Sequence, residues 1–388
     1  MRGRLTPLAA LAIAAAVAGC SSASASGAHS GGSTGGAARP DAAPATPPLS
    51  MVSSVATTGA TWATVPMGAT AGPNEFWQLF TRPAGRASWQ LKTPPGIATN
   101  GALVLAGAGA TLTAGIRPSI DLTFSPITST ADGGQSWTTS SPQTGLADHP
   151  DALAAGPGGQ LIADGENGQV SVLASGGASW SGLTSAQALS TVRGCGLTSV
   201  SAVAYTPGGQ PLVAGTCRTA GAAGVLVRSG SGWQLAGVPR PASLKGQPVQ
   251  VLRLTRTSAG DVALFQAGTS LFAGWSGDGR HWSVSRPLGT GGASVASVSY
   301  AFKNQVGVEL TGGRAQTVSG PGGAWTALPT LPTVAAGHSV ALALPAGGGT
   351  EALAADAGSM TVYQLTGARW VKTQTIKVPI QYGSSSGS

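Results

Sequence analysis

Seven tryptophans recur along this chain at nearly constant spacing, and this repeat is the feature that most constrains the fold. They are Trp89, Trp137, Trp180, Trp233, Trp282, Trp325 and Trp370, separated by 48, 43, 53, 49, 43 and 45 residues. Each follows a short apolar run and a turn of small residues, and each opens a second short run. Units of about 40–50 residues with four short strands are typical of propeller blades. The repeat predicts an all-β fold, a seven-bladed β-propeller of four-stranded antiparallel blades.

Strand and turn signals divide the body of the chain into units of this length. The expected blade boundaries are 51–95, 96–144, 149–186, 196–242, 247–288, 293–330 and 336–376. The chain contains 60 glycines, which argues against long helices because Gly costs about 1 kcal/mol relative to Ala inside a helix. An array of immunoglobulin-like sandwiches would require units of about 100 residues, roughly twice the observed period.

The N-terminus has the features of an export signal. Residues 1–19 place two arginines before an apolar stretch that is too short for a membrane span, which needs about 20 residues. The sequence Val17-Ala18-Gly19-Cys20 resembles the lipobox of bacterial lipoproteins, which implies cleavage before Cys20 and lipidation of its sulfur. An ordinary signal peptide followed by a chance cysteine is the alternative. The lipobox reading predicts an extracytoplasmic protein anchored to the cell membrane.

The remaining segments follow from composition. Residues 20–50 are almost entirely Ser, Gly, Ala, Thr and Pro, which predicts a flexible linker after the lipidated cysteine. The propeller is expected over 51–382 and a flexible Gly-Ser tail over 383–388.

Cysteine usage agrees with export. If Cys20 carries lipid, Cys195 and Cys217 remain, and they flank the open end of an expected hairpin over 198–217. An even remainder in an exported protein predicts a disulfide, with two free thiols as the alternative. The four histidines are dispersed along the chain, so neither a metal nor another cofactor is expected.

The formal charge of +8 comes from scattered residues without a Lys/Arg run. This pattern weakens any nucleic-acid interpretation. We expect a monomer that contacts the membrane through its lipid alone and that binds an unidentified protein or glycan partner at the cell surface.

Two of the tryptophan turns carry a recognisable motif. The string Thr130-Ala131-Asp132-Gly133-Gly134-Gln135-Ser136-Trp137 matches the Asp-box of sialidases and other BNR-repeat propellers, and Ser276-Gly277-Asp278-Gly279-Arg280-His281-Trp282 is a form shorter by one residue. The chain thus resembles the BNR/Asp-box (sialidase-like) β-propeller superfamily. An Asp side chain accepts backbone N–H bonds in such a turn, Gly adopts a positive φ, and Trp buries its ring between sheets. These residues are expected to be structural: Thr130, Asp132, Gly134, Trp137, Ser276, Asp278, Gly279 and Trp282.

The resemblance implies a ligand face opposite the Asp-box turns. That face is expected to consist of the loops between second and third strands and the loops between blades. The charged residues of those loops are Glu75, Arg117, Asp164, Glu166, Arg218, Arg314 and Asp356. Asp164 and Glu166 form the closest acidic pair and are expected on one exposed turn.

Function is less constrained than fold, because propellers carry many activities. The preferred hypothesis is a non-catalytic binding or interaction scaffold at the cell envelope. The alternative is an Asp-box-type glycoside hydrolase, sialidase-like or xyloglucanase-like. Arg117, Arg218 and Arg314 suggest a sialidase arginine triad, but Ile116-Arg117-Pro118 differs from that family's Arg-Ile-Pro motif and sialidase propellers have six blades.

Overall fold

The computed structural model describes residues 52–67, 76–94, 101–118, 126–139, 150–165, 168–301, 304–334, 339–356 and 358–379. Within these ranges the chain is almost entirely strand. One short α-helix, α1 (Ala186–Leu189), and one 3-10 turn (Ala242–Leu244) interrupt the strands. No helix in the described part of the chain is long and apolar enough to cross a membrane.

The strands of the first half form antiparallel series of four. The first series contains β1 (Val52–Ala56), β2 (Ala60–Met67), β3 (Phe76–Pro83) and β4 (Gln90–Leu91). The next contains β5 (Gly101–Ala108), β6 (Thr111–Pro118), β7 (Ile127–Thr130) and β8 (Thr138–Thr139). It is followed by β9 (Pro150–Ala155), β10 (Leu161–Gly165), β11 (Gln169–Leu173) and β12 (Trp180–Ser185). Within each series, every strand after the first pairs with the one that precedes it in the chain.

The second half repeats this plan. Its series are β13 (Leu197–Tyr205), β14 (Pro211–Cys217), β15 (Ala223–Ser229) and β16 (Gly232–Leu235); then β17 (Val249–Thr257), β18 (Gly260–Ala267), β19 (Ser270–Ser276) and β20 (Ser283–Val284), with β21 (Leu288–Gly289) also paired to β19. They continue with β22 (Val295–Tyr300), β23 (Gln305–Leu310), β24 (Arg314–Ser319) and β25 (Thr326–Ala327), and end with β26 (Val340–Ala343), β27 (Glu351–Ala355), β28 (Ser359–Thr366) and β29 (Arg369–Lys377).

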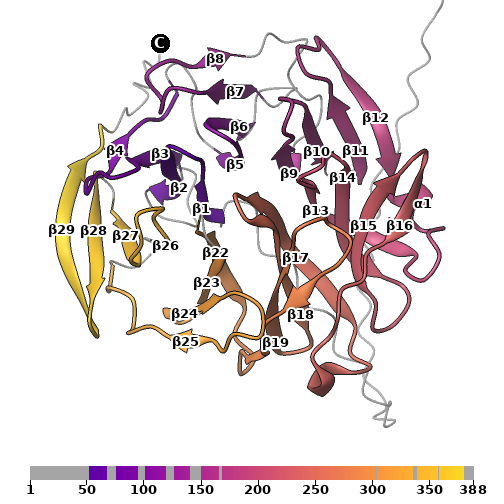
Figure 1. Cartoon of the computed structure of the whole chain (residues 1–388). Helices are drawn as coiled ribbons and strands as arrows, with labels where there is room; N and C mark the ends of the chain where they lie inside the picture. Colours follow the sequence, from indigo (N-terminus) through magenta and orange to yellow (C-terminus); the bar gives the residue numbers. More distant parts are fainter. Residues whose placement is uncertain are drawn as a thin grey trace, which may run out of the picture. The chain divides into compact units, whose positions relative to one another are not determined.

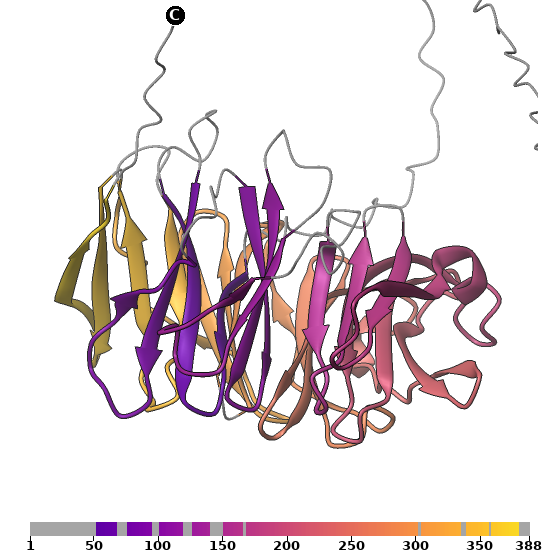
Figure 2. The ribbon, with the colours of Figure 1, turned by 90° about the horizontal axis from the view of Figure 1, so that it is seen from above.

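The series are arranged around a common centre, as in a β-propeller (Figure 1). The first strand of each series lies near the centre and the fourth lies at the periphery. Because the strands run antiparallel, the turns after first and third strands lie at one edge of every sheet. Figure 2 shows the sheets from the side, with the first-hairpin turns along the lower face. We call this face the hairpin face.

The core lies between neighbouring sheets. Between the β13–β16 and β17–β20 series, Leu212 and Val225 pack with Phe265 and Trp282. The Phe265 ring stacks on Phe272 at 4.9 Å and meets the Trp282 ring edge-on at 6.2 Å. This packing removes apolar faces of both sheets from water, which is the main force that holds propeller sheets together.

The seven repeating tryptophans all belong to or pack against such apolar clusters, but the extent of their burial differs. Trp89 and Trp282 are 1% and 5% exposed. The other five rings are only partly buried, namely those of Trp137, Trp180, Trp233, Trp325 and Trp370. These tryptophans lie in or next to fourth strands, which form the periphery of the ring (Figure 1).

One feature at the centre was not expected from the repeat. Strand β1 pairs in parallel with β22, with Val52 opposite Val298 and Ser54 opposite Ser299. This contact joins the first series and the β22–β25 series into one eight-stranded sheet. A hydrogen bond from the Ser299 hydroxyl to the Leu342 carbonyl then ties β22 to β26. At the centre of the ring, two first strands, β1 and β22, are therefore joined by backbone hydrogen bonds.

The ends of the ring meet between β1–β4 and β26–β29. The Glu351 carboxylate accepts hydrogen bonds from Arg82 Nη1 at 2.6 Å and from Trp89 Nε1 at 2.7 Å. The Gln374 side-chain amide binds both backbone groups of Trp89, at 2.8 and 2.9 Å. The Phe80 ring adds an apolar cluster with Leu353 and Met360. First and last sheets are thus joined by side chains, while each keeps its own consecutive strands.

The predicted disulfide is supported by the structure. Cys195 and Cys217 are bonded across a sequence separation of 22 residues, with their Cα atoms 4.7 Å apart. Both are buried beside Leu197 at the open end of the β13–β14 hairpin. The link fixes the segment that joins α1 to β13.

We expect Glu351→Gln to lower the free energy of unfolding by about 3 kcal/mol, because it leaves the largely buried Arg82 guanidinium without its carboxylate. Arg82→Gln should cost a similar amount. The free energy of unfolding of the double variant should be no lower than that of the less stable single variant, since both changes break the same contact. Chemical denaturation followed by circular dichroism measures all three. Strictly additive losses would show that the pair does not act as a unit.

Candidate functional site

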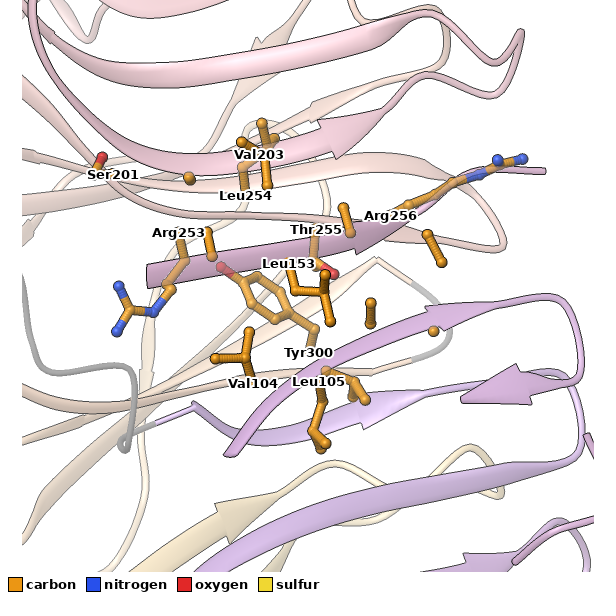
Figure 3. A pocket seen from close by; sticks show the side chains of 17 residues that line it. Val104, Leu105, Leu153, Ser201, Val203, Arg253, Leu254, Thr255, Arg256 and Tyr300 are labelled. Carbon is orange, nitrogen blue, oxygen red and sulfur yellow. The ribbon is translucent and has the colours of Figure 1, made fainter. Parts of the chain in front are cut away.

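The inner strands enclose a cavity at the centre of the ring. It has a volume of about 50 Å³ and is lined by residues of β1, β5, β9, β13, β17 and β22. We call it the inner cavity. Its lining is mainly aliphatic: the side chains of Val104, Leu105, Leu153, Val203 and Leu254 gather around the Tyr300 ring (Figure 3).

Polar groups of the inner cavity come from Ser201 of β13 and from residues of β17 and β22. Arg253 is 6% exposed, and its Nη1 donates to the Leu252 carbonyl at 2.7 Å. The Tyr300 hydroxyl is buried and makes no hydrogen bond among the described residues. Burial raises the pKa of Tyr300 well above its usual range, and the nearby Arg253 charge opposes this rise. The hydroxyl therefore stays protonated and remains a donor.

A larger cavity opens on the hairpin face and adjoins the inner one. It has a volume of about 450 Å³ and is lined by the turns β1–β2, β5–β6, β9–β10 and β17–β18. We call it the funnel. Gly107, Ala155 and Arg256 line both the funnel and the inner cavity. Figure 3 shows that the Arg253 and Arg256 side chains extend in opposite directions from the aliphatic group.

A buried carboxylate lies behind Arg256. In the sheet register Asp261 of β18 is opposite Arg256 of β17 on one side and Ser276 of β19 on the other. The Asp261 residue is 0% exposed, and neither carboxylate oxygen accepts a hydrogen bond from the described residues. Burial raises the pKa of Asp261 to about 8; the Arg256 charge lowers this pKa and the Asp278 charge raises it.

The Asp-box turns have the predicted turn chemistry. Asp132 accepts backbone N–H bonds from Gln135 and Ser136 and the hydroxyl of Thr130 at 2.8 Å. These bonds, chiefly those from Ser136, hold the pKa of Asp132 well below its usual range. Gly134 has φ 82° and donates its N–H to the Thr130 hydroxyl. A conformation of this kind favours glycine.

The second Asp-box repeats these contacts. Asp278 accepts the backbone N–H groups of Arg280 and His281, each at 2.8 Å, and the His281 ring at 2.7 Å. The contacts with His281 are the main reason why the pKa of Asp278 lies well below its usual range. Ser276 binds the Gly279 N–H, and Trp282 Nε1 donates to the Gly279 carbonyl. Both aspartates therefore shape turns.

The charged residues expected on the ligand face lie in several different sheets, all near second-to-third connections. Arg117 lies near the end of β6, Asp164 near the end of β10, Arg218 directly after β14, Arg314 at the start of β24 and Asp356 directly after β27. This is the sheet edge opposite the hairpin face. Cys20, Glu75 and Glu166 lie outside the described residues, as does the Arg117 side chain.

Local contacts differ among the described members of this set. Arg218 is exposed. Arg314 Nη2 donates to the Thr290 carbonyl at 2.6 Å. Asp356 accepts the N–H groups of Gly358 and Ser359 and so shapes its own turn. The expectation that Asp164 lies on an exposed turn is wrong: β10 continues to Gly165, and Asp164 is 2% exposed within it.

Sequence reasoning missed the residues that line the centre. Arg253, Arg256 and Tyr300 lie on strands that the blade pattern predicts, but the pattern does not tell which strand residues face the axis. The available signal was charge on a first strand, since Arg253 and Arg256 interrupt an otherwise apolar and hydroxyl-bearing run. The described residues contain no cluster of three or more metal-ligating side chains.

We expect Asp261→Asn to change the pH dependence of stability. The unfolded chain releases the Asp261 proton near its ordinary pKa of 3.8, whereas the folded chain holds it to about 8. Between these values the folded state binds more protons, so the free energy of unfolding contributed by Asp261 falls as pH rises. The melting temperature of the variant minus that of the wild type should therefore increase from about pH 4 to about pH 8.

Asp132→Asn is the matched control, with the opposite sign. Its folded pKa is lowered, so the stability that Asp132 contributes is present above about pH 4 and is lost as pH falls. Melting curves recorded by circular dichroism between about pH 2 and pH 9 measure both effects. Parallel profiles for the wild type and Asp261→Asn would mean that Asp261 is ionised in the folded protein.

Comparison with known proteins adds structural neighbours and no relatives by sequence. No protein-family model and no curated protein matches the chain. Among solved structures, YCF48 from Cyanidioschyzon merolae is 14% identical, with 79% of this chain and 92% of that one covered and a TM-score of 0.44. The Swd1 β-propeller domain from Myceliophteria thermophila is 10% identical, with coverages of 73% and 89% and a TM-score of 0.46.

A third neighbour is apo AztD from Citrobacter koseri, 11% identical, with 84% of this chain and 86% of that one covered and a TM-score of 0.46. Similarity at this level carries no information about ligand or activity. The arrangement of the sheets around one centre is what identifies the described part of the chain as a β-propeller.

Proposed function

We propose that this chain is an exported, lipid-anchored, seven-bladed propeller that acts as a non-catalytic binding scaffold at the cell envelope. The seven blades are the series β1–β4, β5–β8, β9–β12, β13–β16, β17–β20, β22–β25 and β26–β29, with the eight-stranded sheet counted as two blades joined through β1 and β22. Lipidated Cys20 and the linker over 20–50 tether the propeller, and the partner is a protein or glycan.

The proposal that the propeller is non-catalytic rests on the structural contacts that its acidic side chains make. Asp132, Asp278 and Asp356 hold turns, and Glu351 joins the first and last sheets. Glu309 accepts the Ser297 hydroxyl at 3.0 Å, and burial raises its pKa to about 7. A glycoside hydrolase places two carboxylates on either side of a sugar. Here these carboxylates serve the scaffold, whereas arginines provide the charge around the centre.

The partner face in this proposal is the edge of second-to-third connections. Arg218, Arg314 and Asp356 are exposed there. Arg117, Glu75 and Glu166 belong to the same set of connections in the sequence, whereas Asp164 is buried within β10. Loops at one edge of a closed ring converge toward its axis, so a single partner can contact loops of several blades at once.

The anchor is tested by Cys20→Ala. The variant lacks the sulfur that would carry the lipid, so the protein should leave the membrane fraction for the medium or accumulate as an unprocessed precursor. Fractionation followed by mass spectrometry of the N-terminal peptide distinguishes the two results. Mature protein that stays in the membrane fraction without lipid would rule out this anchor.

The partner face is tested by photo-crosslinking on cells that carry the full chain. A photoreactive amino acid in place of exposed Arg218 should give a discrete adduct in the envelope, because this position lies on the proposed face. The matched control position is Gln135, exposed on the Asp-box turn at the opposite edge. Equal adducts at both positions would contradict the assigned face. Turnover of a sialoside or of xyloglucan by the purified protein would contradict the non-catalytic proposal.

A further inference from the structure

The funnel is a formed cavity with fixed walls. The Thr57 hydroxyl donates to the Ala60 carbonyl at 3.1 Å and accepts from Trp62 Nε1 at 3.3 Å. The Thr257 hydroxyl donates to the Gly260 carbonyl at 3.1 Å. These bonds hold the β1–β2 and β17–β18 turns that form its rim. A volume of about 450 Å³ lies within the range of small-molecule sites, about 300–1,000 Å³.

Arg256 is the only charged side chain among the described residues that line the funnel. It is half-buried, and no hydrogen bond within the described residues takes up its guanidinium. The adjacent Asp261 does not neutralise it through a contact, because neither Asp261 oxygen accepts a hydrogen bond there. An arginine presents five N–H donors in a planar fork, which fits a carboxylate or phosphate in a bidentate manner.

The lining of the inner cavity sets a second requirement for a ligand, namely an apolar end. It adjoins the funnel at Gly107, Ala155 and Arg256, and aliphatic side chains such as Leu153 and Leu254 line it (Figure 3). The Arg253 side chain extends away from these aliphatic side chains (Figure 3), so the surface that they offer is apolar, and a few methylene groups gain from leaving water against it. A molecule that pairs with Arg256 can direct its apolar end inward from the funnel.

We propose that the funnel binds a small organic anion, with a carboxylate or phosphate group paired to Arg256 and a short apolar part in the inner cavity. This site lies on the hairpin face, opposite the edge proposed for the protein or glycan partner. It is therefore independent of that proposal: loss of one does not imply loss of the other. Hexanoate and hexyl phosphate represent the two head groups, and acetate and 1-hexanol each lack one half of the required chemistry.

The test is calorimetric titration of the purified full-length chain at about pH 7. The wild type should bind hexanoate, hexyl phosphate or both saturably, and should bind acetate and 1-hexanol at least about tenfold more weakly. Arg256→Gln should weaken binding of the preferred anion at least about tenfold. Arg256→Lys, which keeps the charge but not the fork, should fall between. Preference for one head group identifies it as the carboxylate or the phosphate class.

Arg86→Gln is the matched control, since Arg86 lines a separate cavity of about 230 Å³ next to the β26–β27 turn. It should leave the affinity unchanged, and melting curves should show that every variant is folded. The proposal fails if Arg256→Gln and Arg86→Gln bind equally well, or if acetate binds as tightly as hexanoate. It also fails if the wild type shows no saturable binding of either hexyl anion up to about 10 mM.

Discussion

The architecture depends on the contact that closes the ring. Each sheet buries its faces against two neighbours, so the first and last sheets would each expose one apolar face if they did not meet. Glu351 prevents this by binding Arg82 and Trp89 at once, and an apolar cluster around Phe80 and Leu353 lies beside it. Burial raises the pKa of Glu351, and the hydrogen bonds from Trp89 and Arg82 oppose this rise. The same bonds supply the donors that a buried carboxylate requires.

The sequence was sufficient for features that repeat or that act locally. The tryptophan period predicted the antiparallel series of strands, and the Asp-box strings predicted which atoms hold the turns at Asp132 and Asp278. Cysteine parity and the position of one hairpin predicted the link between Cys195 and Cys217. These inferences use either the repeat itself or residues that are close together in the sequence, so they need no knowledge of how distant strands meet.

Features that join distant parts of the chain were not accessible in this way. Arg82 and Glu351 are 269 positions apart, and the parallel pairing of β1 with β22 joins units separated by four others. The burial of Asp164 was missed because β10 extends beyond its apolar run, and most repeated tryptophans are less buried than expected because fourth strands lie at the periphery. Which residues of a first strand face the axis depends on twist and on bulges, such as the one between Val251 and Arg253. For this reason Arg253 of the inner cavity and Arg256 of the funnel could not be assigned from the sequence.

The pairing of β1 with β22 has an evolutionary consequence. The inner cavity is lined by six of the first strands, and β26 contributes no residue to its lining. The last blade closes the ring, yet it stands outside the chamber that the other blades enclose. Substitutions in the inner strand of that blade leave the chamber lining unchanged but must preserve its own core, because Ala341, Leu342 and Ala343 are 4%, 0% and 0% exposed. A change at a lining position of the other first strands alters the chamber itself. Homologous chains should accordingly keep small or aliphatic residues in the inner strand of their final repeat, while changes in the size of the chamber come from the other first strands.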